Sequence, residues 1–103
     1  MEFIETPTFS RLLNGLLSDE EFRNLQNLLI MNPERGVIIR GSGGIRKLRF
    51  GILDRGKSGG LRLIYYWKKD FQQIFLLVIY SKSRKDDLTS AETAILRKLV
   101  REI

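Results

Sequence analysis

The 103-residue chain contains neither cysteine nor histidine. Without cysteine, no disulfide bond can hold the fold together and no thiolate can bind a metal ion. Without histidine, the chain lacks the usual general acid–base group and the commonest metal ligand. Any catalysis must therefore depend on lysine, arginine, tyrosine or carboxylate side chains, or on positioning of the substrate.

Long apolar runs are also missing. No stretch approaches the roughly 18 apolar residues of a membrane-spanning helix, and the start of the chain, with Glu2 and Glu5, is acidic and unlike a signal peptide. The hydrophobic fraction of 43% argues against disorder. We therefore expect a single domain covering residues 1–103, a cytoplasmic location and no association with a membrane.

Acidic residues are scarce in the middle of the chain. Residues 35–69 contain ten Lys or Arg and one acid, Asp54, whereas the other residues carry eight bases and eleven acids. Charge concentrated in this way predicts a face that binds polyanions. Nucleic acid is the leading partner class, ahead of an anionic membrane, because no basic amphipathic helix is evident.

Capping signals predict three helices. Thr6-Pro7 is a helix start, with Thr as the N-cap and Pro at the first helical position. Ser18–Glu21 and Thr89–Glu92 are capping boxes, which open a second helix that ends near Asn32 and a third helix at the end of the chain. Apolar side chains follow the first two starts at helical spacing, so we expect an N-terminal helical hairpin.

The strand signals predict an α+β fold. Short strands are expected at Glu2–Glu5 and Val37–Arg40, and two longer ones on either side of the glycine- and charge-rich turn within Gly51–Gly60. The uninterrupted apolar run Ile74–Tyr80 indicates a strand buried on both faces and central in the sheet. The predicted architecture is a helical hairpin packed on a small antiparallel β-sheet, with a C-terminal helix.

One motif is best explained as accidental. Gly51–Ser58 satisfies the phosphate-loop pattern G-x-x-x-x-G-K-[ST]. That loop works only between a strand and a helix whose N-terminus holds the phosphates. Here Gly59, Gly60 and a further strand follow, so we interpret the segment as a hairpin loop and not as a nucleotide site.

Alternation along the two long strands is more informative. Leu48 and Phe50 share one face of the first strand, and Lys47 and Arg49 share the other. If the more apolar faces point toward the helices, Arg62 of the second strand converges with Lys47 and Arg49 on the opposite side. These cations are either a nucleic-acid site or an ordinary solvated sheet face. An aromatic beside them, Tyr66, either stacks on a base or packs in the core.

The order and spacing of several segments resemble the HigB branch of the RelE-like toxins, which belong to bacterial type II toxin–antitoxin pairs. The resemblance covers nearly the whole chain and is carried by Asn32–Gly36, Gly41–Arg49, Gly56–Tyr66, Leu76–Lys82 and Asp87-Leu88. It implies a compact microbial-RNase-like fold and ribosome-dependent endonucleolytic cleavage of mRNA in the A site.

The resemblance also implies site residues. Lys47 and Arg49 match the family's paired basic strand residues, Arg62 matches an arginine on the next strand, and Lys82 or Arg84 is the counterpart of a basic residue after the following strand. The predicted catalytic residues are Lys47, Arg49, Arg62 and Arg84, and the predicted RNA-binding residues are Arg46, Lys57, Tyr66, Lys82 and Lys85. Where some relatives have a tyrosine, this chain reads Asp87-Leu-Thr89.

The implied reaction is attack of a substrate 2′-hydroxyl on the adjacent phosphate. Lys47 would act as base or as stabiliser of the 2′-oxygen, Arg62 would bind the phosphate, and Arg49 or Arg84 would lie near the leaving group. We expect no metal and no cofactor. The expected partners are mRNA, the ribosome and a cognate antitoxin with a helix-turn-helix domain, and operator DNA would be bound only through that antitoxin.

Two other classes of function compete with the nuclease. The first is a non-catalytic domain that binds RNA or the ribosome through the same face. The second is a pure interaction or DNA-binding module, which is disfavoured because the basic residues lie on strands and no recognition helix stands out.

Overall fold

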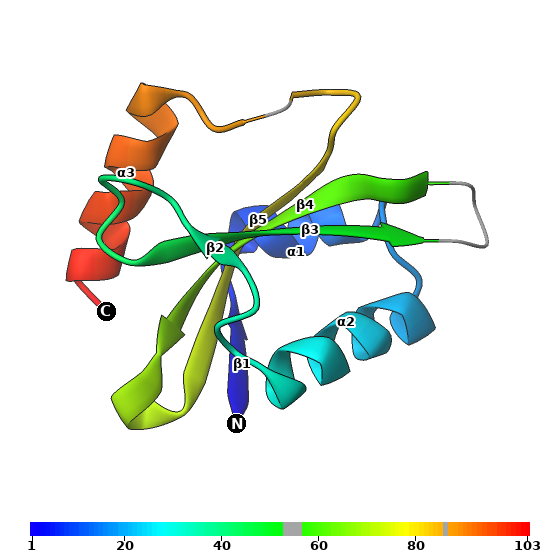
Figure 1. Cartoon of the computed structure of the whole chain (residues 1–103), viewed down its shortest axis with the longest axis horizontal. Coiled ribbons are helices and arrows are strands. Elements are labelled where there is room, and N and C mark those ends of the chain that lie inside the picture. Colours follow the sequence, from blue (N-terminus) through cyan, green and yellow to red (C-terminus); the bar gives the residue numbers. More distant parts are fainter. Residues whose placement is uncertain (53–56, 86) are drawn as a thin grey trace.

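A computed structural model describes residues 1–52, 57–85 and 87–103, and the side chains of all of these except 52 and 57–59 (Figure 1). Helices come first, followed by most of the sheet and then a closing helix, as predicted. In chain order the elements are β1 (Glu2–Glu5), α1 (Pro7–Leu13), α2 (Asp19–Met31), β2 (Val37–Ile38), β3 (Ile45–Ile52), β4 (Lys57–Lys68), a 3₁₀ turn (Lys69–Phe71), β5 (Gln73–Ser81) and α3 (Ser90–Arg101).

The strands form one mixed sheet in the order β1-β5-β4-β3-β2. Three of the pairings are antiparallel, whereas β1 runs parallel to β5. The parallel pair is the one departure from the antiparallel sheet that we expected. Contact between the two segments continues in the turn from β1 into α1, where the Thr6 hydroxyl donates to the Leu77 carbonyl of β5 at 2.8 Å. β5 therefore has a neighbour on both sides, although β4 and not β5 is the middle strand.

The predicted helix starts are confirmed in atomic detail. The Thr6 hydroxyl accepts from the Phe9 amide at 3.0 Å and caps α1, with Pro7 as its first residue. Ser18 and Thr89 each form a complete capping box at the starts of α2 and α3. Each N-cap of this kind stabilises a helix by about 1 kcal/mol.

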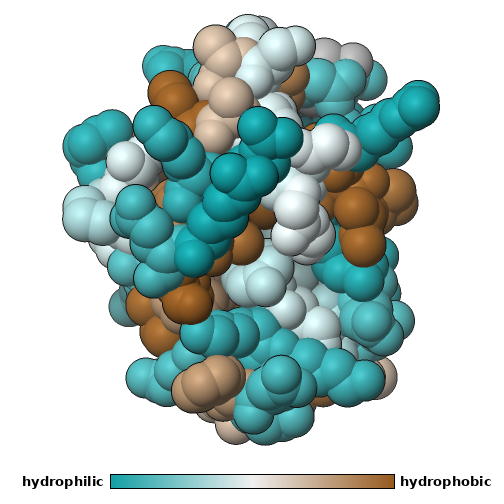
Figure 2. All heavy atoms as spheres, turned by 90° about the vertical axis from the view of Figure 1, so that its left-hand side faces the viewer, coloured by the Kyte–Doolittle hydropathy of each residue, from teal (hydrophilic) through white to brown (hydrophobic). Residues whose placement is uncertain are grey.

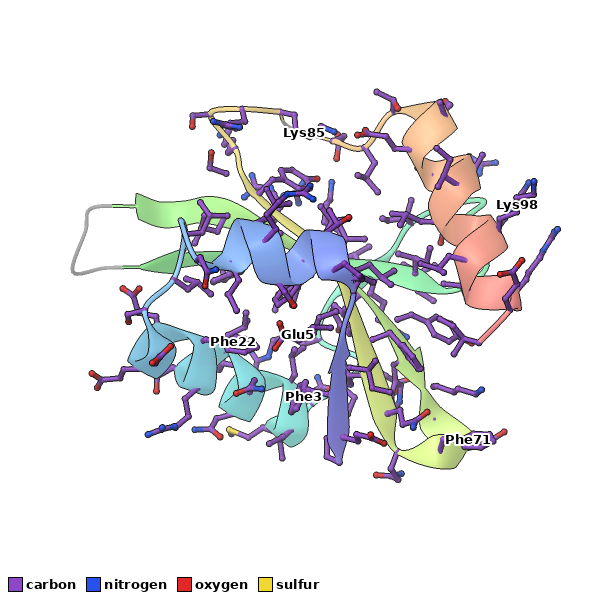
Figure 3. The ribbon with its side chains drawn as sticks, turned by 180° about the vertical axis from the view of Figure 1, so that it is seen from behind. Phe3, Glu5, Phe22, Phe71, Lys85 and Lys98 are labelled. Atoms are coloured by element: carbon purple, nitrogen blue, oxygen red, sulfur yellow. The ribbon has the colours of Figure 1, made fainter. Side chains whose placement is uncertain are left out.

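The helices lie on opposite faces of the sheet. Phe9 of α1 and Leu29 of α2 are fully buried against one face, in a cluster that includes Leu63 and Tyr65 of β4. The Phe9 ring lies 5.8 Å from that of Phe22, which joins the two helices of the hairpin (Figure 3). No helix in the described part of the chain is long and apolar enough to cross a membrane.

α3 covers part of the other face. Its Val100 packs in a second cluster with Ile45, Ile64 and Leu77. Because successive residues of a strand point to opposite faces, Ile64 of β4 lies on this face while Leu63 lies on the first. The side of β3 and β4 that carries the predicted cations is therefore the side of α3, beyond the part that α3 covers.

The phosphate-loop motif has a strand on each side. β3 and β4 pair with each other as an antiparallel hairpin, with Ile52 opposite Lys57. Residues 53–56 of the motif lie outside the described residues. Since β4 begins at Lys57, the helix that a phosphate loop requires does not follow, and the interpretation of a β-hairpin is confirmed.

A buried tyrosine fixes the turn that leads into β2. The Tyr65 hydroxyl donates to the Pro33 carbonyl at 2.7 Å and accepts from the Gly36 amide at 2.9 Å. Burial raises the pKa of this phenol above its usual value of 10.0, so it stays neutral and keeps both hydrogen bonds. Arg46 adds hydrogen bonds from its Nη1 to the Glu34 and Gly36 carbonyls, at 3.1 and 2.7 Å.

Gly36 fits only because it has no side chain. A Cβ at this position would lie 2.9 Å from Tyr65 Cε1 and 3.1 Å from the Lys47 carbonyl carbon and oxygen. We expect Gly36→Ala to lower the free energy of unfolding by about 1–3 kcal/mol, because a buried backbone atom and a fixed ring must move. Chemical denaturation measures the change.

Gly15 provides the matched control. Its added Cβ would meet nothing nearer than the Leu12 carbonyl oxygen at 4.0 Å. Gly15→Ala should leave the free energy of unfolding unchanged or raise it by up to about 1 kcal/mol. Equal effects of the two substitutions would contradict the close packing inferred around Gly36.

Candidate active site

A cavity of about 600 Å³ opens beside β3, between β2 and the segment that leads into α3. Its wall contains three cations and one carboxylate among the described residues. The lining residues are Arg35, Val37, Ile38, Ile39, Lys47, Leu48, Arg49, Asp87, Leu88 and Thr93. A cavity with this charge is suited to an anionic ligand.

Lys47 lies at the centre of the wall that β3 forms. Its Cα pairs with that of Val37 in β2 on one side and that of Ile64 in β4 on the other. The side chain is only 16% exposed, and its ammonium group forms an ion pair with the Asp87 carboxylate. Flanking strands therefore hold this amine in place at the inner edge of the cavity.

Two arginines lie next to each other on neighbouring strands. Arg49 of β3 and Arg62 of β4 are direct cross-strand partners. Arg49 is exposed, whereas Arg62 is 4% exposed and donates from Nη1 to the Leu61 carbonyl at 3.1 Å. Like charges directly opposite each other destabilise a sheet, so this pair favours the approach of an anion.

Nearby cations lower the pKa of Asp87. The hydrogen bond and the charge of Lys47 lower the pKa of this carboxyl below its ordinary value, and the charges of Arg49 and Arg62 lower it further. The strand register places the three cations predicted from alternation on one face of the sheet, with Arg49 opposite Arg62 and Lys47 two residues from Arg49. Lys47 contacts an exposed carboxylate there, where a phosphate group would also carry negative charge.

Two predicted cations of the loop after β5, Arg84 and Lys85, lie away from the cavity of Lys47 and in different surroundings. Arg84 lines a separate cavity of about 260 Å³, together with Arg11 and Tyr80. Lys85 pairs with Glu92 and lies 5.7 Å from the centre of the Tyr80 ring (Figure 3). This loop does not deliver Arg84 to the cavity of Lys47, so the expectation that it lies near the leaving group is not supported by its position.

Arg46, Tyr66 and Lys82, three other predicted RNA-binding residues, also lie outside the described cavity wall. Arg46 is engaged with the turn at Glu34–Gly36, on the opposite face of β3 from Lys47. Tyr66 packs against the second core cluster. Lys82 is exposed and its backbone amide donates to Gly60. The side chain of Lys57 lies outside the described residues.

Two charged lining residues were not predicted as site residues. Arg35 belongs to the turn before β2, and its only sequence signal was its place in the basic segment of the chain. Asp87 was noted where relatives have a tyrosine, but its role opposite Lys47 depends on the path of the loop after β5. Among the described residues, no three carboxylates lie close enough together to hold a metal ion.

Comparison with known families identifies the kind of protein to which this chain is similar. Residues 6–103 match the family described as the RelE toxin of the RelE/RelB toxin–antitoxin system. The chain belongs to the RelE toxin family. The α+β fold with N-terminal helices, a five-stranded sheet and a C-terminal helix is consistent with RelE-like proteins. RelE toxins are paired with RelB antitoxins. The resemblance to the RelE-like toxins is therefore confirmed at the level of the family.

The ion pair predicts how Asp87 titrates. Lys47→Met should raise the pKa of Asp87 toward the ordinary carboxyl value of about 3.9, because the hydrogen-bonding ammonium is the largest cause of the lowering. NMR of the carboxyl carbon during an acid titration measures this pKa. In the parent protein the stabilisation by the pair is present above pH about 3.9 and is lost as the pH falls through the lower folded-state value. An unchanged Asp87 titration in Lys47→Met would contradict the pairing.

Neutralising Asp87 should strengthen the binding of a polyanion. Asp87→Asn removes the one negative charge among the described lining residues, so the affinity should rise by about fivefold, the order expected for one charge at contact distance in water. Heparin binding measured by calorimetry tests this. Glu34→Gln is the control, since Glu34 pairs with Arg46 away from the cavity, and a gain equal to that of Asp87→Asn would show a non-specific charge effect.

Proposed function

We propose that this RelE-family protein is a ribosome-dependent mRNA endoribonuclease of the HigB branch, acting as the toxin of a type II toxin–antitoxin pair. The proposal is supported above all by one observation: Lys47 and Arg49 line one cavity together with Asp87, and Arg62 lies directly opposite Arg49 on the neighbouring strand. A phosphodiester entering the cavity would meet Lys47 and Arg49, and Arg62 beside Arg49 would add to the positive charge. Preorganised positive charge of this kind stabilises a pentavalent phosphorane.

The cleavage would proceed through the 2′-hydroxyl of the substrate. Its oxygen forms a bond to the adjacent phosphorus, and the bond from phosphorus to the 5′-oxygen of the next nucleotide breaks. The proton of the 2′-hydroxyl passes to the Asp87 carboxylate, and the leaving 5′-oxygen takes a proton from solvent. The products are a 2′,3′-cyclic phosphate and a free 5′-hydroxyl.

The cations have distinct tasks in this reaction. Lys47, released from Asp87 by the substrate, stabilises the developing 2′-oxyanion. Arg49 is exposed and contacts the phosphate. Arg62, its cross-strand partner on β4, is almost buried and adds positive charge beside it. Because the cations hold the pKa of Asp87 low, this carboxylate is a weak proton acceptor, and electrostatic stabilisation supplies more of the rate than proton transfer.

The partners follow from this function. The ribosomal A site would supply much of the orientation of the mRNA, so we expect weak activity on free RNA and a place of action in the cytoplasm, where ribosomes translate. An antitoxin with a helix-turn-helix domain would silence the toxin and carry it to operator DNA. No cofactor or metal ion takes part in the proposed mechanism.

The competing function is non-catalytic binding of RNA or the ribosome through the same cations. Primer extension on mRNA after induced expression separates the two. Discrete breaks within translated codons support the nuclease. Growth arrest with intact mRNA would overturn it in favour of simple binding.

Substitutions at the cavity test the assignment of residues. We expect Lys47→Ala and Arg49→Ala each to lower the rate of mRNA cleavage on purified ribosomes by about 10²-fold, the usual cost of removing one charge-stabilising group. Circular dichroism checks that the variants are folded. Arg84→Ala removes a cation from the separate cavity and should change the rate by less than about threefold on the same scale. Cleavage at the parental rate by both cavity variants would show that the site is wrong.

A further inference from the structure

A second cavity adjoins the first along the start of α3. It has a volume of about 450 Å³ and shares Ile39, Leu88 and Thr93 with the wall of the cavity described above. Its remaining lining residues are Arg40, Gly41, Ser90, Ala94 and Arg97. The two cavities therefore meet across three common side chains and form a continuous groove between the Ile39–Gly41 segment and α3.

Two arginines from distant parts of the chain line this second cavity. Arg40 is exposed on the segment after β2, and Arg97 is exposed on α3. Arg97 is held across the turn, where its Nη1 donates to the Gly41 carbonyl at 3.4 Å and its Cγ would lie 3.5 Å from a Cβ at Gly43. Among the described residues, neither arginine forms an ion pair.

The charge of the groove has one sign over most of its length. The first cavity presents Arg35, Lys47 and Arg49 with Asp87, and the described lining of the second adds Arg40 and Arg97 without a carboxylate. α3 begins at Ser90 in the same wall, and the N-terminal end of a helix adds partial positive charge. On the side of the molecule that carries α3 and the Gly41–Gly44 turn, hydrophilic side chains cover much of the surface (Figure 2).

We infer that Arg40 and Arg97 form a subsite for the backbone of a nucleotide flanking the cleaved phosphodiester. The inference rests on the proposed function, since the first cavity is assigned to the scissile phosphate. Single-stranded RNA fits because its phosphates repeat along the strand, and a groove with cations at both ends can hold two of them. Guanidinium groups suit this task because they present several donors to phosphate oxygens.

Binding of single-stranded RNA to purified protein tests the subsite. The probes are a fluorescent dinucleotide, which has a single phosphodiester, and a longer oligoribonucleotide, each with a 2′-deoxy sugar on the 5′ side of the phosphodiester that would be cleaved. Fluorescence anisotropy gives the affinity at several salt concentrations between about 50 and 200 mM, where phosphate contacts determine the salt dependence. The test variant is the double substitution Arg40→Ala with Arg97→Ala.

The matched control is Lys98→Ala with Arg101→Ala. It also removes two positive charges from the exposed surface, but neither residue lines the groove. Lys98 projects outward from α3 (Figure 3). The two double variants have the same net charge, so a difference between them reports position and not total charge.

The subsite predicts an effect that depends on the length of the RNA. For the longer RNA, the Arg40/Arg97 variant should lower the slope of log affinity against log salt by about 0.7 for each phosphate that the protein no longer neutralises, and the control should keep the parental slope. For the dinucleotide, whose one phosphate occupies the first cavity, the two variants should bind alike. Equal affinities and slopes of both variants for the longer RNA would overturn the inference, as would tighter binding of the parent protein to polyglutamate than to RNA of the same charge.

Failure of the subsite and failure of the proposed function give different results. Cleavage of mRNA on ribosomes by the parent, together with unaltered binding by the Arg40/Arg97 variant, would remove the subsite and leave the nuclease. Length-dependent weakening of RNA binding in that variant, without any cleavage by the parent, would support the subsite and remove the nuclease.

Discussion

The site depends on the sheet, which holds like-charged side chains close together against their mutual repulsion. The antiparallel register of β3 and β4 sets Arg49 directly opposite Arg62, and Lys47 lies two residues along the same face as Arg49. Two hydrophobic layers keep this register, because a slip by one residue would move every apolar side chain of the strand to the other face. The packing of the core thus maintains a cluster of cations that would otherwise separate. Asp87 partly neutralises the cluster in the free protein.

Alternation and capping explain why so much could be predicted from the sequence. A period of two on β3 and β4 places Lys47, Arg49 and Arg62 on one face whatever the details of the loops, and this was confirmed. The caps at Thr6 and Ser18 depend only on residues within one helical turn. Local rules of this kind need no knowledge of the tertiary structure, which is why the helices and the basic face were found together.

The structure departs from the sequence-based expectations where long-range contacts decide. The parallel pairing of β1 with β5 joins Glu2–Glu5 to residues about 70 positions further along the chain, and no local signal specifies it. Arg46 was expected to bind RNA, but the carbonyls of Glu34 and Gly36 are nearer partners in the fold. The loop after β5 directs Arg84 to a separate cavity and brings Asp87 to Lys47, although both residues lie in one short charged segment. Charge alone could not assign them to different sides.

The wall of the cavity joins segments that are made at different times. Lys47 and Arg49 lie near the middle of the chain, whereas Asp87, Leu88 and Thr93 complete the wall from the segment that leads into and begins α3. During translation, the cations of β3 leave the ribosome well before their opposing wall does. The cavity therefore closes only when synthesis has passed α3, so an unfinished chain that still lacks this segment carries the charged strand without the cavity.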